Sequence, residues 1–231
     1  MIGNDIVDLA DPRAAGKSRD LRFMDRVFTA KERQAIFNHV NRDLYLWSLW
    51  AGKETAYKAL CKIYSALSSA PGRYEIELFP SAGPVPERGV ARTPCGSVSL
   101  RLFTGRDHLH CIGVTAGHDT DSVMWDVARI DRGNADPGYQ SEIVRNMIKR
   151  AASCYLKESP ETMEIVRIRG PRGLGPPVLY VRKAQTTLDI SMSHDGRFVA
   201  CALQDIRGKS TTPQDAPAGN NVTVGVGGSR Q

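Results

Sequence analysis

The stretch 43-DLYLWSLWAGKETAYKALCKIYSAL-67 decides the fold, because it holds the strongest helical pattern in the chain. Its apolar residues recur at helical spacing and would face the core; they are Leu46, Leu49, Ala56, Leu60 and Ile63. Trp50, Glu54 and Lys58 form a second row, each four residues from the next, so they share another face. The pattern predicts a long helix with one buried face and one face that carries charged side chains. Before it, Thr29 is followed three residues later by Glu32, a capping-box signature that predicts the start of another helix.

Strand patterns follow this helix and a second one. Residues 139–158 form the second helical pattern, and alternating apolar stretches separated by Pro- and Gly-rich turns follow both helices. The predicted strands are 73–79, 97–103, 108–117, 162–168, 177–183 and 187–203. We therefore predict an α+β fold of two related lobes, a pseudo-dimer in which each lobe packs a long helix on a small antiparallel sheet.

The lobes are predicted to span residues 1–130 and 138–206, and the sequence DRGNADPG at residues 131–138 is predicted to be a linker. Gly117-His118-Asp119 in the first half resembles Ser193-His194-Asp195 in the second, which indicates an internal repeat. Residues 207–231 are rich in Gly, Ser, Thr, Asn and Pro and have few apolar side chains, so we expect them to be a disordered tail.

The first predicted strand, Ile2 to Leu9, contains two carboxylates among apolar residues. Asp5 and Asp8 lie in the sequence IGNDIVDL. Because burial of an unpaired charge is costly, such an acid needs an ionic partner, a metal ion or a solvent-lined cleft.

Composition restricts the class of protein. The chain has 231 residues, 41% of them hydrophobic and 24% charged, which is ordinary for a globular protein. The net charge of +6 favours an anionic partner, although it also fits general solubility. We expect no membrane span and no export signal, and the odd number of widely spaced cysteines, five in all, favours reduced thiols; the predicted localisation is cytoplasmic.

Carboxylates and lysines in the two stretches above suit a divalent cation that also holds a phosphate. Mg²⁺ takes oxygen ligands and usually one or two protein carboxylates, here Asp5 and Glu54, while Lys53 and Lys58 could neutralise phosphate oxygens. This combination points to phosphoryl transfer. The alternative is an ordinary helical salt bridge between Glu54 and Lys58, worth about 0.2–0.5 kcal/mol.

Several motifs in order resemble the 4′-phosphopantetheinyl transferase superfamily. IGNDIVDL resembles the opening (I/V)-G-x-D motif of the family. DRVFTAKE resembles the segment that follows this motif in the holo-acyl-carrier-protein synthase branch. WAGKETAYKAL resembles the W-x-x-K-E-x-x-x-K motif. ISMSHDGRFVACA resembles the S-H-(D/S/T) strand of the family, and GLGPPVL its G-x-P turn. The motifs cover about a quarter of the chain.

The resemblance implies a function and a role for each matching residue. The activity would be transfer of 4′-phosphopantetheine from coenzyme A to a serine of an apo carrier protein, with Mg²⁺ and release of 3′,5′-ADP. Asp5 and Glu54 would bind the metal, Glu54 or a water that it orients would act as base, and Lys58 would bind the pyrophosphate. The residues implied in contact with coenzyme A are Lys53, Lys58, Ser193, His194, Gly175 and Pro177.

The chain departs from both branches of the family. Larger, surfactin-type members carry a further acid where this chain has Val7, whereas Asp8 matches an acidic position of the smaller branch and is given a supporting role. The chain has the larger size, yet its His motif comes last. We therefore expect Asp5 and Glu54 to face His194 across the interface of the lobes, with His118 as a vestigial copy.

The expected partner is an acidic apo carrier protein that docks through Arg13, Arg19 and Arg22, with no nucleic acid and no membrane. Two lobes in one chain imply a monomer. A non-catalytic basic module that binds a carrier protein or nucleic acid is the alternative, and strong, salt-dependent, metal-independent DNA binding would favour it.

Overall fold

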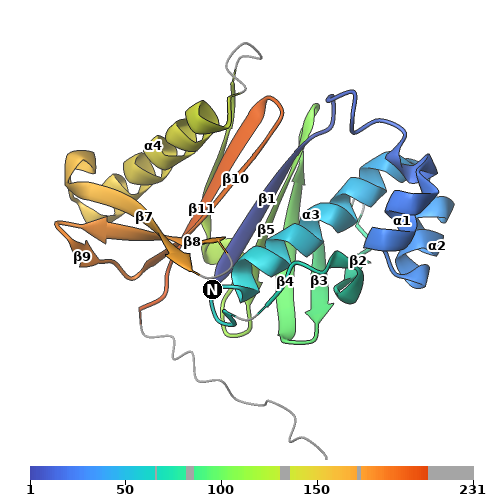
Figure 1. Ribbon diagram of the computed structural model, residues 1–231, viewed down its shortest axis with the longest axis horizontal. Helices are drawn as coiled ribbons and strands as arrows, with labels where there is room; N and C mark the ends of the chain where they lie inside the picture. Colours follow the sequence, from blue (N-terminus) through green and yellow to red (C-terminus); the bar gives the residue numbers. More distant parts are fainter. Residues whose placement is uncertain (66, 82–85, 131–135, 171–172, 208–231) are drawn as a thin grey trace, which may run out of the picture.

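Two antiparallel sheets meet along the first strand of the chain, β1 (Ile2–Asp8) (Figure 1). The computed structural model describes residues 1–65, 67–81, 86–130, 136–170 and 173–207. The predicted linker at residues 131–138 lies mostly outside these ranges, and the predicted tail lies outside them from residue 208. In the described part, the strands form a five-stranded sheet in the order β1-β5-β4-β3-β2 and two three-stranded sheets, β10-β11-β6 and β7-β8-β9.

The helices and strands are arranged as a mixed α/β fold with antiparallel sheets. The helices are α1 (Leu21–Val27), α2 (Ala30–Asn38), α3 (Arg42–Leu60) and α4 (Pro137–Leu156). The strands after β1 are β2 (Glu75–Phe79), β3 (Arg88–Thr93), β4 (Gly96–Thr104), β5 (His108–Thr115), β6 (Met124–Arg129), β7 (Met163–Gly170), β8 (Gly173–Val181), β9 (Ala184–Gln185), β10 (Leu188–Asp195) and β11 (Phe198–Asp205). No helix of the described residues is long and apolar enough to cross a membrane.

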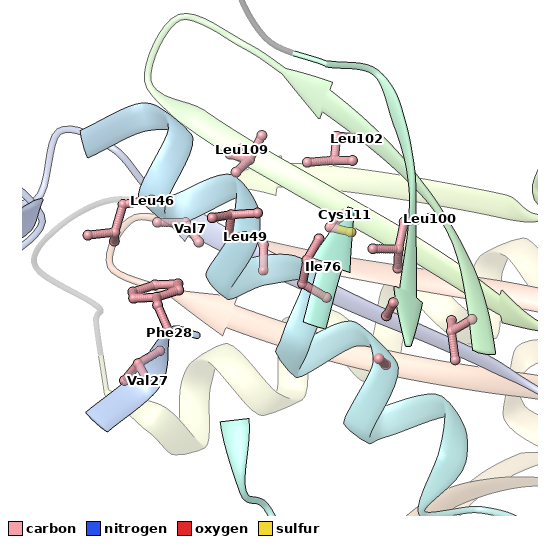
Figure 2. Close-up of a cluster of buried hydrophobic side chains, with 14 of the residues drawn as sticks. Val7, Val27, Phe28, Leu46, Leu49, Ile76, Leu100, Leu102, Leu109 and Cys111 are labelled. Atoms are coloured by element: carbon pink, nitrogen blue, oxygen red, sulfur yellow. The ribbon is translucent and has the colours of Figure 1, made fainter. Parts of the chain in front are cut away.

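The helix α3 packs on the five-stranded sheet, as its pattern predicted. Leu46, Leu49, Ala56 and Leu60 are buried in the main core, part of which is drawn in Figure 2, whereas Ile63 lies past the end of the helix and is 37% exposed. Asn41 caps the start of α3 by accepting a hydrogen bond from the backbone of Leu44.

A glycine allows α3 to approach β1 closely. A Cβ atom at Gly3 would lie 2.1 Å from the backbone oxygen of Thr55, so no larger residue fits there without moving the helix. This close approach brings the charged row of α3 next to the carboxylate of β1.

The second half repeats part of this arrangement. The order β6-β11-β10 follows the order β1-β5-β4, and α4 packs on β10 and β11 as α3 packs on its own sheet (Figure 1). The change of sheet lies between β5 and β6, earlier than the predicted boundary at residue 130, because β6 pairs with β11.

The sequence repeat was placed in the wrong register. His194 lies on β10, which takes the place of β4 in the repeated order, whereas His118 follows β5. The two histidines do not occupy equivalent places, so the interpretation of His118 as a copy of His194 is wrong.

The two halves join along a seam between β1 and β10. The backbone N–H groups of Ile2, Asn4 and Asp8 donate to side chains of β10, at 2.6 Å to Asp189, 3.0 Å to Ser191 and 2.8 Å to Asp195. Each partner lies 187 residues further along the chain, so β1 and β10 run in the same direction in fixed register.

Candidate functional site

Asp5 lies in the middle of β1 and has the ionic partner that its burial requires. The ammonium of Lys58 on α3 lies 2.7 Å from Asp5 Oδ1 and donates a second hydrogen bond of 3.0 Å to the backbone oxygen of Asn4. Asp5 is only 9% exposed, and burial raises the pKa of its carboxyl although Lys58 opposes the shift. The strand carboxylate and the helix lysine therefore form one charged unit.

Glu54 lies one helical turn before Lys58 and adds a second carboxylate. Burial and repulsion from Asp5 raise the pKa of Glu54, and Lys58 opposes this shift only partly. Among the described residues, no group donates a hydrogen bond to the Glu54 carboxylate, and Lys58 pairs with Asp5 in place of Glu54. The alternative of a simple Glu54–Lys58 salt bridge is therefore wrong, and the Glu54 carboxylate is left available to a ligand.

His194 and Ser193 come from the second half, at the end of β10. Burial and the positive charges of Lys58 and Arg167 lower the pKa of His194, so its imidazole is neutral at pH 7. Asp5 opposes this shift, which means that His194 lies within electrostatic reach of both Asp5 and Lys58. Ser193 is buried, and its hydroxyl accepts a hydrogen bond of 2.9 Å from the Asn4 amide across the seam.

A cavity of about 580 Å³ opens beside Lys58, between the end of α3, the β7–β8 hairpin and β10; Asp5, Glu54, Ser193 and His194 are not among its described lining residues. It is lined by Tyr57, Lys58, Cys61, Lys62, Ser65, Leu67, Arg167, Ile168, Gly173, Leu174, Gly175, Pro176, Pro177, Ser191 and Met192. These described residues include three cationic side chains and no carboxylate, and much of the remainder is apolar. Such a cavity suits an anionic ligand with an apolar portion.

Three features of this lining bear on the sequence predictions. Gly175 and Pro177 line the cavity, as the expected cofactor turn requires. Arg167 on β7 lines the cavity but lies outside the motifs that resemble the family, so the sequence did not mark it as a site residue. Lys62 also lines the cavity and was missed; its place one turn after Lys58 was the available signal.

Lys53 is not brought to the cavity. Its side chain is buried, and its ammonium lies 2.8 Å from Glu32 Oε2 and 3.0 Å from the Pro71 oxygen, with a further bond to the Tyr74 oxygen. Three acceptors use all three hydrogens of the ammonium, so none remains for a cofactor. Glu32 is also the N3 residue of the predicted capping box, which the structure confirms, and Lys53 thus anchors α3 to α2.

Asp8 joins the two halves. Arg197, in the turn between β10 and β11, donates bonds of 2.8 Å and 2.6 Å from its guanidinium to the two Asp8 oxygens, and both side chains are buried. Although burial opposes it, this fork lowers the pKa of the Asp8 carboxyl. Gly196 has a positive φ of 51°, and a Cβ there would lie 2.5 Å from Asp8 Oδ2, so the turn needs glycine.

The three arginines predicted to dock a partner lie in the segment that follows β1. Arg13 is exposed and pairs with Asp11 at 2.7 Å, while Arg19 and Arg22 lie at the turn before α1 and at its first residues. Asp195, at the end of β10, is close enough to interact electrostatically with Arg13. The three arginines therefore belong to the half of the chain that holds Asp5 and Glu54.

The carboxylates fit a divalent cation that takes few protein ligands. Asp5 and Glu54 repel each other and share Lys58 as their cation, so a metal ion would offset the remaining negative charge. In the described part of the chain, no three His, Cys, Asp or Glu side chains are grouped as a metal site. Two carboxylates with open positions suit Mg²⁺, which usually keeps water and takes phosphate oxygens.

Comparison with known proteins supports the resemblance. Residues 1–112 match the family described as the 4′-phosphopantetheinyl transferase superfamily, which confirms the resemblance found in the motifs. These 112 of 231 residues include Asp5, Glu54 and Lys58 and end before His194. A search of curated proteins found no match.

A solved structure was also matched. The crystal structure of Thermotoga maritima holo-[acyl-carrier-protein] synthase shares 14% sequence identity with this chain at a TM-score of 0.34. The match covers 80% of this chain and 83% of that one. The family match over residues 1–112 is thus the comparison that bears on function.

Proposed function

We propose that the chain is a 4′-phosphopantetheinyl transferase of the holo-acyl-carrier-protein synthase type. It would transfer the phosphopantetheine group of coenzyme A to a serine of an apo acyl or peptidyl carrier protein, with Mg²⁺, and release 3′,5′-ADP. The observation that carries this proposal is the grouping of Asp5, Glu54 and Lys58 with His194 beside a cavity whose described lining has three cations and no carboxylate. The family match over residues 1–112 supports it.

Coenzyme A fits the chemistry of the cavity. It combines three phosphate groups with an adenine ring and a pantetheine arm, so it needs both cations and apolar surface. Lys58 and Arg167 offer the charges, while Leu67, Ile168 and Leu174 offer the apolar surface. We assign Gly175 and Pro177 to the wall that contacts the cofactor.

In the proposed reaction, the carrier serine attacks the phosphorus that bears the pantetheine arm. The bond from this phosphorus to the bridging oxygen of the pyrophosphate breaks, and 3′,5′-ADP leaves with that oxygen. Glu54, or a water that it orients, accepts the serine proton. Lys58 stabilises the charge that develops on the leaving phosphate.

The other site residues bind or orient. Asp5 and Glu54 would hold Mg²⁺, which when bound neutralises phosphate charge. His194, neutral at pH 7, can donate one N–H to a phosphate oxygen. We give Ser193 a positioning role, because its buried hydroxyl binds Asn4, whose backbone oxygen in turn binds Lys58.

One chain would hold one complete site. The repeated order of β1-β5-β4 and β6-β11-β10 supports a pseudo-dimer formed by duplication, in which the second half takes the place of a neighbouring subunit. The predicted monomer follows from this arrangement. Docking of an acidic carrier through Arg13, Arg19 and Arg22, and a cytoplasmic location, stay predictions.

The test is the intact mass of an apo carrier protein after incubation with this chain, coenzyme A and Mg²⁺. The proposal expects a gain equal to one phosphopantetheine group, which disappears when a chelator removes the metal. If several carrier types show no gain and coenzyme A does not bind, the proposal fails. Salt-dependent DNA binding would then favour the basic binding module.

A further inference from the structure

Lys62 borders the cavity but has no hydrogen left for a ligand. Its ammonium donates to Asp189 Oδ1 at 2.7 Å, to the Ile2 oxygen at 2.8 Å and to the Ile190 oxygen at 2.7 Å. An ammonium has three donors, and all three are used within the protein. Lys62 therefore shapes the cavity without binding what enters it, unlike Lys58 or Arg167.

The partner of Lys62 extends the link to a third element. Asp189 on β10 accepts the backbone N–H of Ile2 through its second oxygen, at 2.6 Å. Lys62 and Asp189 thus tie together the end of α3, the start of β1 and the start of β10. These three elements carry the site residues: Glu54 and Lys58 on α3, Asp5 on β1, and Ser193 and His194 on β10.

Burial makes stability a poor explanation for this ion pair. The Lys62 and Asp189 side chains are 7% and 8% exposed, and the desolvation of a buried pair can cancel its Coulomb attraction. An apolar pair would fill the same space at similar stability. What an apolar pair would lack is the fixed set of hydrogen bonds that holds α3 against β10.

The opposite end of the seam is fastened in the same way. Asp8 and Arg197 form a second buried ion pair between the halves, and Asp5, Ser193 and His194 lie between the two pairs along the strands. The seam is therefore fixed at both ends of the stretch that holds the site.

We infer that Lys62 and Asp189 are positioning residues, which fix α3 relative to β10 and so set the separation of Lys58, at the edge of the cavity, from His194 on β10. This inference rests on the proposed function, since the ligand that spans the gap would be coenzyme A. Both residues act through others: Lys62 borders the cavity, but its three ammonium hydrogens are used within the protein, and Asp189 is not among the described lining residues.

The experiment compares Lys62→Met, Asp189→Asn and the double variant in the full chain. Lys62→Met alone leaves a buried aspartate without its cation and should lower the melting temperature most. The double variant removes both charges, and the side-chain amide oxygen at position 189 can still accept the hydrogen bond from the Ile2 N–H. The melting temperature of the double variant should therefore recover. The dissociation constant of coenzyme A and kcat/KM with an apo carrier are measured below all melting temperatures.

A positioning role predicts that function does not recover with stability. The double variant should bind coenzyme A at least tenfold more weakly than the unaltered chain, with a lower kcat. Ile148→Ala, which weakens the core of the second half on α4, a helix with no residue in the described lining of the cavity, is the control and should lower the melting temperature without this effect. A double variant that recovers binding and kcat together with its melting temperature would overturn the inference.

A ligand-free readout separates this inference from the proposed function. The NMR signals of the His194 imidazole should shift in all three seam variants but not in Ile148→Ala. If the unaltered chain neither binds coenzyme A nor modifies a carrier, the proposed function fails, whereas unchanged His194 signals in the seam variants would contradict the positioning role itself.

Discussion

The ammonium of Lys58 lies 2.7 Å from a carboxylate oxygen of Asp5, and this ion pair joins the central helix to the first strand. Glu54, the nearer acid in sequence on the same helix face, is not the partner. The helix lysine is therefore held at the strand, while the helix glutamate stays open. In the proposed phosphoryl transfer, this division would give each of the three charges a separate task.

Replacing Lys58 with Gln should weaken both binding and transfer. The change removes the cation beside the proposed pyrophosphate and leaves Asp5 buried without its partner. We expect kcat/KM to fall by about 10²-fold or more, in the range seen when one stabilising donor is lost. Calorimetric titration with coenzyme A and a carrier assay measure the effect. Lys31→Gln, at an exposed ion pair with Glu75, is the control and should leave both quantities unchanged.

Replacing Glu54 with Gln should abolish transfer without unfolding the protein. Loss of a general base costs about 10²–10⁴-fold in rate. Burial and Asp5 raise the pKa of Glu54 in the folded state, so the folded protein favours the protonated form of this carboxyl. The free energy of unfolding therefore decreases as the pH rises through the folded-state pKa, and the ionised carboxylate destabilises the fold at neutral pH. Thermal unfolding at pH 7 should thus show an equal or higher melting temperature; a clear drop would contradict the open-carboxylate description.

The same carboxyl should titrate above the ordinary range of glutamate in the metal-free protein. Burial and repulsion from Asp5 raise the pKa of Glu54, whereas Mg²⁺ bound to the carboxylate would favour its ionised form. An NMR titration of the Glu54 side-chain carboxyl with and without Mg²⁺ measures both shifts. A metal-free midpoint at about pH 4.5, the ordinary pKa of glutamate, would contradict the description of Glu54 as a buried carboxylate beside Asp5.

Replacing Arg167 with Met should weaken binding of coenzyme A. Arg167 lines the cavity, and no sequence motif marked it, whereas Arg169 lies two residues further along β7 and is not among the described lining residues. Loss of a phosphate contact should raise the dissociation constant about tenfold and reduce its salt dependence. Arg169→Met carries the same loss of charge, and an equal effect from it would point to general electrostatics.

Charge reversal at Arg19 and Arg22 should affect the carrier and spare coenzyme A. These arginines are proposed to meet an acidic carrier, so the double change to Glu should raise KM for the carrier several-fold. Lys149→Glu combined with Arg150→Glu on α4, on the opposite flank of the molecule (Figure 1), changes the charge by the same amount and is the matched control. Equal effects from both variants would argue against a defined docking face.

His110 should make the fold sensitive to acid. Burial lowers the pKa of His110 to about 3, so the unfolded chain binds a proton that the folded chain excludes between pH 6.5 and pH 3. The free energy of unfolding should therefore decrease as the pH is lowered through this window, by about 1.4 kcal/mol for each pH unit well below 6.5. Urea unfolding at about pH 7 and about pH 4.5, on either side of the ordinary histidine pKa, measures this loss of stability. The loss between the two pH values should be smaller in His110→Gln than in the unaltered chain, and equal losses would contradict this assignment.

Local sequence patterns predicted the features that depend only on residues close together in the chain. The helical period of residues 43–67, the capping box of Thr29 and Glu32 and the strand that holds Asp5 are short-range signals, and the structure confirms each. The end of α3 at Leu60 was missed, because the apolar period continues beyond it to Ile63. The strands β3 and β6 and the short helix α1 were also missed, since they are defined by their partners more than by their own sequences.

Long-range contacts explain the remaining errors. The sequence around Lys53 resembles a cofactor-binding motif, but the side chain is bound by Glu32, a residue 21 positions away. The tie between Lys62 and Asp189 spans 127 residues and has no sequence signature. The register of the repeat could not be read from the two His-Asp pairs, because strand order, and not spacing, decides which residues are equivalent.

The most direct test of the central claim, that two halves of one chain build one transferase site, is complementation between inactive chains. Glu54→Gln and His194→Ala chains are assayed separately and in equimolar mixture, with the intact mass of an apo carrier as the readout and the unaltered chain alongside. We predict that the unaltered chain adds one phosphopantetheine group and that the mixture adds none, because each chain lacks part of its own site. A mixture that modifies the carrier would show that the site forms between chains and would contradict the account, and an unaltered chain that modifies no carrier would contradict the activity itself.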